Sequence, residues 1–169
     1  MINYKLSGGA RILFVGINPH FGSYRRGVPF SNNKMFWYLL SRAGLIDEKM
    51  ETLRDDKELR RFYDERFMQK YNLNIINIVD TPTRQAVNLD EEEIRKGVRR
   101  LNEVIIKYHP KVVCFVGKVT FRTYTGEKRV HYGWQKNIMS SKVFVMHFPV
   151  RGSAKTRINE LKQIQRFTA

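Results

Sequence analysis

Residues 11–30 read RILFVGINPHFGSYRRGVPF, and the rest of the chain is organised around this stretch. Arg11 is followed by an unbroken apolar run, which predicts a strand buried on both faces. Gly16, an amide residue and a proline come next and mark a sharp turn at the end of the strand. Because ligands bind at the carboxyl ends of strands in open α/β sheets, Asn18 is the first candidate functional side chain. The alternative role for Asn18 is an Asx turn, in which the amide bonds only to its own backbone.

The composition favours one folded domain over residues 1–169. The chain is 42% hydrophobic, which is ordinary for a domain with a sizeable core. No apolar run approaches the roughly 18 residues that a membrane span needs. The first ten residues lack the apolar centre of a signal peptide. We therefore expect a protein of the cytoplasm or nucleoid without a membrane partner. We also expect a monomer, although no feature of the sequence bears on the oligomeric state.

Cysteine and histidine usage gives no support for a metal or another cofactor. The single cysteine, Cys114, lies in an apolar run. It cannot by itself ligate an iron–sulfur cluster or build a cysteine-rich zinc site. The four histidines show neither HxxxH nor HExxH spacing. We expect no metal, no iron–sulfur cluster and no other cofactor.

The charge predicts a polyanionic partner. Lys and Arg total 31 against 16 Asp and Glu, which gives a net charge of +15. The excess is uneven, because from Lys118 onward eleven basic residues stand against two acidic ones. Such a basic half is typical of proteins that bind nucleic acid. Generic solubility, or an organism whose proteins are basic in general, is the alternative explanation of the charge.

Strand, loop and helix patterns alternate along the chain. Apolar runs predict strands at residues 11–15, 73–79, 111–116 and 143–146. Helical spacing predicts helices at residues 36–43, 47–70, 90–108, 118–124 and 153–167. Residues 126–141 are polar and predict a hairpin or a loop. The alternation predicts an α/β three-layer sandwich, with a mainly parallel four-stranded central sheet and helices on both faces.

Polar loops at the carboxyl ends of these strands are the candidate binding elements. Residues 17–30 predict a binding loop closed by Phe30, which either stacks on a base or plugs the core. The pair Gly117-Lys118 can contact phosphate, but it lacks the upstream glycine of a P-loop. The loops that hold Asn18 and His147 should meet at one edge of the sheet.

Taken together, these motifs resemble the uracil-DNA glycosylase superfamily. The first family motif is a glycine, any residue, Asn or Asp, and proline, and it is matched by Gly16-Ile17-Asn18-Pro19. Further matching blocks are Gly27-Val28-Pro29-Phe30, Phe36-Trp37, Ala43-Gly44-Leu45, Asp80-Thr81-Pro82-Thr83-Arg84-Gln85-Ala86 and Gly117-Lys118. In order and spacing they are similar to the mismatch-specific uracil/thymine-DNA glycosylase branch over nearly the whole chain.

The second family motif departs from that branch. Where the branch has Asn-Pro-Ser, this chain has His147-Phe148-Pro149-Val150-Arg151. A histidine with an arginine four residues later is similar to the single-strand-selective uracil glycosylases, whose motif begins His-Pro-Ser-Pro-Arg. An alternative alignment puts Phe148 at the asparagine position and leaves His147 outside the site.

The resemblance implies a monofunctional DNA glycosylase of base excision repair. Such an enzyme flips a deaminated base, above all uracil in a U·G mispair, and hydrolyses its N-glycosidic bond without lyase activity. The resemblance implies that Asn18 orients the attacking water and that His147 donates a hydrogen bond to the departing base. It implies substrate contacts for Gly16, Ile17, His20, Ser23 and Phe30. It implies DNA contacts for Lys118, Arg151, Gly152, Ser153 and Lys155.

Two of these residues carry specific expectations. His20 follows Pro19 where both branches have glycine and the classical uracil enzymes have a tyrosine beside the pyrimidine 5-position. We therefore expect His20 to exclude a 5-methyl group and to favour uracil over thymine; alternatively it points to solvent and touches phosphate. Arg151 is expected to fill the stack that the flipped base leaves, or alternatively to bind phosphate only.

Rival functions are compatible with the sequence. A glycosylase of the same fold can act on hypoxanthine or mismatched thymine, because the pocket walls are largely backbone. A non-catalytic nucleic-acid-binding α/β module would use the same basic surface and would release no base. A nucleotide-processing Rossmann-like enzyme is disfavoured, since the chain has neither GxGxxG nor a P-loop.

Overall fold

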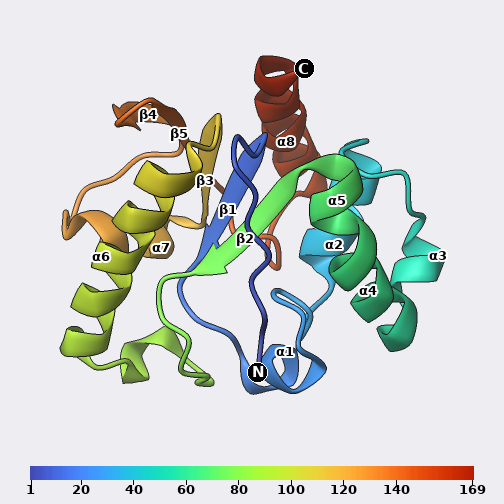
Figure 1. The fold of residues 1–169 in the computed structure, drawn as a ribbon, viewed down its shortest axis with the longest axis horizontal. Helices are drawn as coiled ribbons and strands as arrows, with labels where there is room; N and C mark the ends of the chain where they lie inside the picture. Colours follow the sequence, from blue (N-terminus) through green and yellow to red (C-terminus); the bar gives the residue numbers. More distant parts are fainter.

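A five-stranded sheet forms the centre of the molecule (Figure 1). The computed structural model describes residues 1–169, apart from the side chain of Val87. The strands are β1 (Ile12–Gly16), β2 (Leu73–Asn77), β3 (Val112–Val116), β4 (Gly133–Ile138) and β5 (Ser141–Met146). Their order across the sheet is β2-β1-β3-β5-β4. All neighbours pair in parallel except β4, which is antiparallel to β5.

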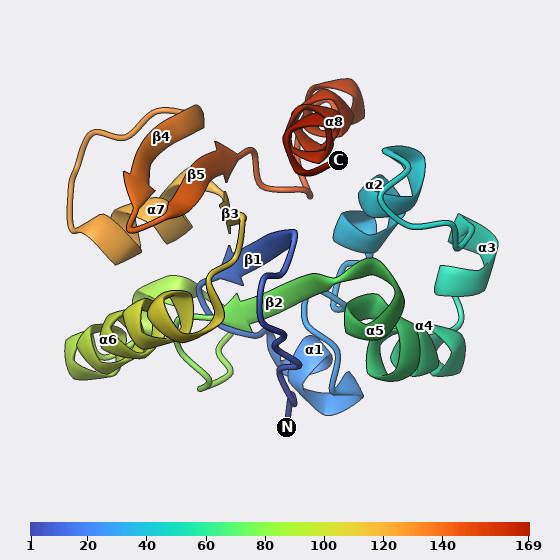
Figure 2. The ribbon, with the colours of Figure 1, turned by 45° about the horizontal axis from the view of Figure 1, so that its top comes forward.

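Helices cover both faces of the sheet (Figure 2). The helical segments are α1 (Phe21–Arg26), α2 (Met35–Arg42), α3 (Met50–Leu53), α4 (Asp56–Phe62), the π-helical turn η1 (Tyr63–Phe67), α5 (Met68–Tyr71), the 3₁₀ turn η2 (Ala86–Asn88), α6 (Glu91–Tyr108), α7 (Lys118–Thr125) and α8 (Ala154–Thr168). Helices α6 and α7 lie on one face, while α2, α4, α5 and α8 lie on the other (Figure 2). Within the described chain, no helix is both long enough and apolar enough to cross a bilayer.

The α/β sandwich with a mainly parallel sheet is confirmed, but the predicted number of four strands is wrong. The additional strand is β4, whose sequence GWQKNI is mostly polar. It lies at the edge of the sheet and is only partly buried, so its sequence lacks the apolar run of a central strand. Trp134 is its main anchor, with its ring 5.0 Å from that of Phe144. Of residues 126–141, predicted as a hairpin or a loop, 126–132 form a loop and 133–138 form the first strand of a hairpin with β5.

The region predicted as one helix over residues 47–70 is divided into four segments. A new helix begins after Asp55, whose carboxylate accepts hydrogen bonds from the backbone N–H groups of Lys57 and Glu58. The apolar periodicity still identifies the buried face, because Leu59, Phe62, Tyr63 and Phe67 are all buried. Side-chain packing therefore follows the sequence pattern although the backbone is interrupted.

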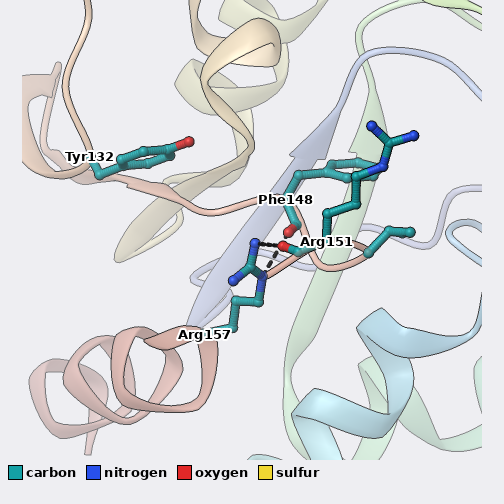
Figure 3. A pocket seen from close by; sticks show the side chains of 5 residues that line it. Tyr132, Phe148, Arg151 and Arg157 are labelled. Atoms are coloured by element: carbon teal, nitrogen blue, oxygen red, sulfur yellow. Dashed lines mark hydrogen bonds between the residues drawn. The ribbon is translucent and has the colours of Figure 1, made fainter. Parts of the chain in front are cut away.

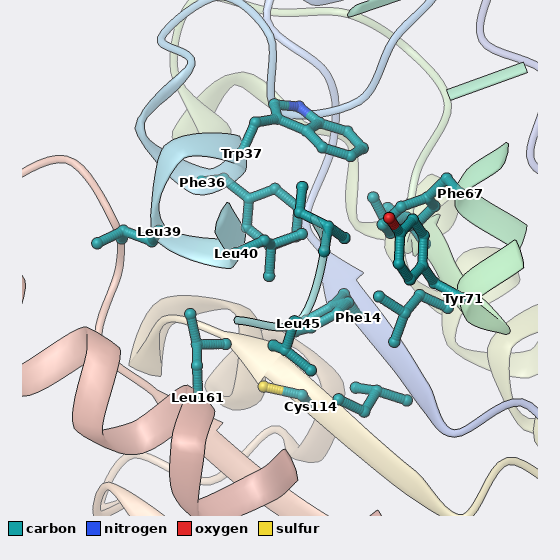
Figure 4. Packing of buried hydrophobic residues seen from close by; sticks show 14 of the residues in the cluster. Phe14, Phe36, Trp37, Leu39, Leu40, Leu45, Phe67, Tyr71, Cys114 and Leu161 are labelled. Carbon is teal, nitrogen blue, oxygen red and sulfur yellow. The ribbon is translucent and has the colours of Figure 1, made fainter. Parts of the chain in front are cut away.

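Two apolar clusters sandwich the sheet, and alternation along the strands divides residues between them. Ile12 and Phe14 of β1 face α2, α5 and α8, whereas Leu13 and Val15 face α6 and α7. Trp37 is fully buried in the first cluster (Figure 4). Its indole nitrogen donates to the carbonyl of residue 29 at 2.9 Å. This bond fixes the segment that precedes α2 to the core, and it thereby positions the chain around residue 30.

Candidate active site

The segments that follow β1 and β2 stay paired beyond the ends of the strands. The backbone N–H groups of Ile78, Val79 and Thr83 donate to the carbonyls of Gly16, Ile17 and Pro19, at 2.9, 2.8 and 3.2 Å. The two polar loops therefore lie side by side at the carboxyl edge of the sheet. This is the edge at which the sequence places its candidate chemistry.

Asn18 is held by the loop that follows β2. Its amide nitrogen Nδ2 donates to the carbonyl of Thr81 at 2.9 Å and to the hydroxyl of Thr83 at 2.7 Å. These partners are 63 and 65 residues away in sequence, so the Asx-turn alternative does not account for the side chain. A carbonyl oxygen only accepts, so the atom that faces Thr81 is the amide nitrogen. Oδ1 then remains to accept a hydrogen bond from a bound water.

Helix α6 supports that second loop from behind. The hydroxyl of Thr81 donates to the carboxylate of Glu93 at 2.8 Å. One residue earlier, Asp80 accepts a charge-assisted hydrogen bond from Arg100 at 2.6 Å. Both partners come from α6, so the loop that holds Asn18 is tied to a long helix. Fixed partners of this kind hold a catalytic side chain in one orientation.

Phe30 lies against the backbone of Gly16. A Cβ atom at position 16 would stand 2.8 Å from Cζ of Phe30 and 2.3 Å from Oδ1 of Asn77, so only glycine fits. Phe30 has a φ of 55°, an unfavourable value for a bulky residue. Its ring packs 4.5 Å from that of Phe36, and it is only partly exposed. Phe30 therefore plugs the core in part, and its remaining surface lies beside the first motif.

The predicted binding loop over residues 17–30 contains a short helix. His20 is the N-cap of α1, and its Nδ1 accepts a hydrogen bond from the backbone N–H of Gly22 at 3.1 Å. Gly27 ends the helix in the left-handed conformation, with a φ of 70°. The capping bond orients the ring of His20 and leaves Nε2 as its other polar atom.

Ser23 is turned inward. It is 2% exposed, and its hydroxyl oxygen accepts hydrogen bonds from the backbone N–H groups of Ser31 and Asn32 at 3.0 and 2.8 Å. The hydroxyl thus joins α1 to the segment before α2. This geometry gives no support to the predicted contact of Ser23 with substrate, because its oxygen already serves the loop.

His147, at the end of β5, is clamped by α8. Its backbone N–H donates to Oε1 of Glu160 at 3.0 Å, and its Nδ1 lies 3.0 Å from Oε2 of the same carboxylate. The imidazole also stacks on Tyr132, with ring centroids 3.5 Å apart. A carboxylate at Nδ1 favours the tautomer with hydrogen on that nitrogen. Nε2 is then the ring atom left for an outside partner.

The loop after β5 is fixed through its backbone (Figure 3). The side chain of Arg157, 7% exposed, donates from Nε to the carbonyl of Phe148 at 2.7 Å and from Nη1 to that of Ser153 at 2.8 Å. Its Nη2 donates to the carbonyl of Arg151. One buried guanidinium on α8 therefore holds three carbonyls of a single loop.

The same loop presents apolar and basic side chains to an open pocket of 510 Å³ (Figure 3). The pocket is lined by Tyr132, Phe148, Val150, Arg151 and Arg157. Phe148 is 52% exposed, and Val150 is 42% exposed. Phe148 also rests 3.5 Å from the Cβ position of Gly117, at the end of β3. An exposed aromatic ring beside a cation provides a surface on which a nucleic-acid base can stack.

The predicted DNA-binding residues lie around this pocket. Arg151, Gly152, Ser153 and Lys155 are exposed at the junction of β5 and α8, where Ser153 is the N-cap of the helix. Lys118 begins α7, and its ammonium lies 4.3 Å from the ring centroid of Tyr132. The structure therefore brings the predicted residues of this group into one region.

Several contributors escaped the sequence interpretation. Thr81 and Thr83 belong to the polar motif of residues 80–86, which follows β2. Their place at a strand end could have identified them as candidates. Arg157 and Glu160 are buried charged residues on α8. Their spacing in the sequence is that of charged residues on the exposed face of a helix, so it does not predict their burial. Tyr132 stands in a polar segment without a motif. No set of three His, Cys, Asp or Glu side chains gathers as a metal site in the part of the chain that the structure describes.

Comparison with protein-family models gives a match to the uracil DNA glycosylase superfamily over residues 5–166. The match spans both loops described above and the whole sheet. It includes the paired segments after β1 and β2, together with the junction of β5 and α8.

Proposed function

We infer the function of this chain from its family, because the chain belongs to the uracil DNA glycosylase superfamily. Membership supports a DNA glycosylase, a hydrolase that acts on DNA in base excision repair. We propose further that the substrate base is uracil in a U·G mispair. We also propose that the enzyme is monofunctional, related to the mismatch-specific branch, with a second motif similar to that of the single-strand-selective enzymes.

The observation that carries this proposal is the fixed amide of Asn18. Cleavage of an N-glycosidic bond passes through an oxocarbenium-like sugar, and water must then reach the anomeric carbon from a defined direction. Asn18 cannot act as a general base, because an amide does not take up a proton near neutral pH. With Nδ2 bound to Thr81 and Thr83, Oδ1 accepts a hydrogen bond from the water and orients it.

The second contribution is stabilisation of the departing base. Uracil leaves as an anion, and a donor aimed at its developing charge is worth on the order of 100–1000-fold in rate. We propose His147 for this role, through Nε2. Because Nδ1 faces the carboxylate of Glu160, the ring donates from Nε2 only when both nitrogens carry hydrogen.

Base recognition is assigned to the wall that Phe30 and the first motif form. The exposed part of the Phe30 ring stacks on uracil, a contact worth about 1–3 kcal/mol per base. The backbone around Gly16 and Ile17 offers hydrogen bonds to the edge of the base. His20, oriented by its capping bond, occupies space near the pyrimidine 5-position and disfavours thymine.

DNA binding is assigned to the basic half of the chain. Phosphate contacts by Lys118, Arg151 and Lys155 should make affinity fall steeply with salt. Flipping a base costs a few kcal/mol, less for a mispaired base. Arg151, on the loop that Arg157 fixes, is suited to fill the vacated stack and to bond the orphaned partner base.

The test is strand cleavage at a single modified base. Labelled duplexes with one U·G, T·G or I·T pair, and single-stranded uracil DNA, are incubated with protein and then treated with hot alkali to break abasic sites. We expect cleavage at uracil in the U·G duplex that collapses in Asn18→Ala. The matched control is Asn137→Ala, the same change at an exposed position of β4, which should retain full activity.

The outcome also separates the rival functions. Cleavage only at hypoxanthine or thymine would keep the mechanism and replace the substrate. Salt-dependent DNA binding without cleavage of any substrate would contradict the enzyme assignment and favour a binding module. If His20→Gly does not raise thymine release relative to uracil release, the steric role of His20 is wrong.

A further inference from the structure

We propose that Thr83 is a positioning residue that, together with the carbonyl of Thr81, makes the site accept an amide and reject a carboxylate at position 18. The proposal rests on the proposed function where it concerns reaction rate. The hydrogen-bond arrangement itself can be tested in protein that is never given DNA.

The argument starts from the direction of each hydrogen bond. Nδ2 of Asn18 carries two hydrogens, and they go to the carbonyl of Thr81 at 2.9 Å and to Oγ1 of Thr83 at 2.7 Å. The hydroxyl hydrogen of Thr83 is itself committed, since it goes to the carbonyl of Gln85 at 2.9 Å. Oγ1 of Thr83 therefore offers Asn18 a lone pair and no hydrogen.

The remaining neighbour of the amide is also an acceptor. The carbonyl of Pro19 lies 3.5 Å from Nδ2. The cradle around this nitrogen, formed by the oxygens of Pro19, Thr81 and Thr83, thus consists of acceptors alone. A hydrogen-bond donor at position 18 completes it, whereas an ionised carboxylate would place negative charge against three oxygen atoms.

The cradle cannot easily rotate to offer a donor. The backbone N–H of Thr83 is bound to the carbonyl of Pro19 at 3.2 Å, which fixes the loop against the first motif. The hydroxyl of Thr81 is bound to Glu93 on α6 at 2.8 Å. Turning the hydroxyl of Thr83 toward position 18 would break its bond to Gln85.

This arrangement of acceptors determines whether asparagine or aspartate suits position 18. The first family motif admits Asn or Asp, and an aspartate would be the stronger base toward water. In this chain the loop after β2 decides between them, because its acceptors fit only the amide. A carboxylate introduced here should therefore lower the rate rather than raise it.

The first test uses thermal stability and needs no activity. We expect Asn18→Asp to lower the melting temperature more than Asn18→Ala at about pH 8, because the charged side chain faces acceptors. The excess should shrink at about pH 5, because the surrounding acceptors raise the pKa of the introduced carboxyl and let it take up a proton, which gives it an O–H donor. Equal melting temperatures of the two variants at both pH values would overturn the proposal.

Other titratable and charged groups near the cradle do not change the difference in melting temperature between the two variants. They are His20 at the start of α1, Asp80 and Arg84 on the loop, and Glu93 and Arg100 on α6. Both variants contain all of them, so the pH dependence of the difference between Asn18→Asp and Asn18→Ala belongs to position 18. Asn137→Asp, an acid introduced on exposed β4, provides the reference for a carboxylate in water.

The second test addresses the position of the amide during turnover. Thr83→Val keeps the shape of the side chain and removes the acceptor, and we expect kcat to fall by about tenfold with KM nearly unchanged. Thr83→Ser restores an acceptor and should recover most of kcat. Equal loss in the valine and serine variants would indicate a purely structural role and contradict the proposal. A wild-type protein that releases no base would overturn the proposed function, and the melting experiment would still decide this inference.

Discussion

Two loop regions at the carboxyl edge of the sheet are fixed in opposite ways. After β1 and β2, the functional side chain is itself bound, because the amide of Asn18 is tied to Thr81 and Thr83. After β5, the buried guanidinium of Arg157 binds the backbone, and Phe148 remains exposed. In the first region, hydrogen bonds fix the side chain of Asn18. In the second region, they fix the backbone of the loop, while side chains such as that of Phe148 stay exposed.

This difference matches the two tasks that we propose for these loops. Orienting a water molecule requires one side-chain geometry, and a misplacement of about 1 Å can cost roughly 100-fold in rate. Contact with a flexible, bent nucleic acid tolerates side chains that adjust, provided that the loop is in place. His147 is the exception in the second region, since Glu160 and Tyr132 immobilise its ring.

The largest effect should come from that exception. His147→Ala is expected to lower the single-turnover rate of uracil release on the order of 100–1000-fold, because it removes the proposed donor to the departing base. Phe148→Ala should cost less than about tenfold and act mainly on DNA affinity, as loss of a stacking surface does. The measurement is single-turnover kinetics at saturating protein. The reverse ranking would assign the second-motif role to Phe148, in accord with the alternative alignment.

The next effect should be on stability. Arg157→Met keeps a long side chain but leaves three carbonyls of the β5 loop unpaired, which should cost about 3 kcal/mol of unfolding free energy. The measurement is urea denaturation. The control is Lys162→Met on the exposed side of the same helix, which should change stability by less than about 0.5 kcal/mol. Equal costs for the two variants would mean that Arg157 does not hold the loop.

A smaller effect is expected for a displayed cation. Arg151→Ala should weaken DNA binding by about 1 kcal/mol and lower the salt slope of the binding constant by about one, as loss of one phosphate contact does. Arg42→Ala, the same change at an exposed position of α2 outside the basic half, is the matched control and should leave both quantities unchanged. An unchanged slope together with slower base release would instead favour the stack-filling role of Arg151. The measurement is fluorescence anisotropy at several salt concentrations.

The smallest effect should lie far from both loops. Hydrogen bonds from Lys34 and Arg26 lower the pKa of the Asp56 carboxyl below its ordinary value of 3.8. A lowered folded-state pKa contributes stability above the unfolded value, and that contribution is lost as pH falls through the folded one. Because Asp56 is 58% exposed, Asp56→Asn should cost only roughly a few tenths of a kcal/mol at neutral pH, and less near pH 2. Urea denaturation at both pH values measures it, and a larger cost at acid pH would contradict the sign.

The sequence predicts the strands of the sheet better than it predicts the residues that fix the functional loops. The four apolar runs identify β1, β2, β3 and β5 because central parallel strands are buried on both faces. An edge strand such as β4 has no such requirement, and its polar sequence conceals it. Asn18 was identifiable because a strand end and a turn motif coincide there.

The residues that fix the loops cannot be predicted from the sequence, because their roles depend on tertiary geometry. Arg157 and Glu160 are three residues apart on α8, a spacing that surface helices use constantly, and only burial reveals their role. Thr83 belongs to a block that the sequence marks, but the direction of its hydrogen bonds follows from the pairing of two loops. The burial of Ser23 likewise depends on how α1 folds back on the segment before α2.

The position of Cys114 has a practical consequence for following the enzyme on DNA. The only cysteine lies fully buried in the sheet (Figure 4), and burial raises the pKa of its thiol well above the ordinary value. Maleimide dyes attack exposed thiolates, so the native protein should ignore them. A second cysteine placed on the displayed loop after β5 would then take up the dye alone. Site-specific fluorescent labelling therefore does not require Cys114 to be replaced first.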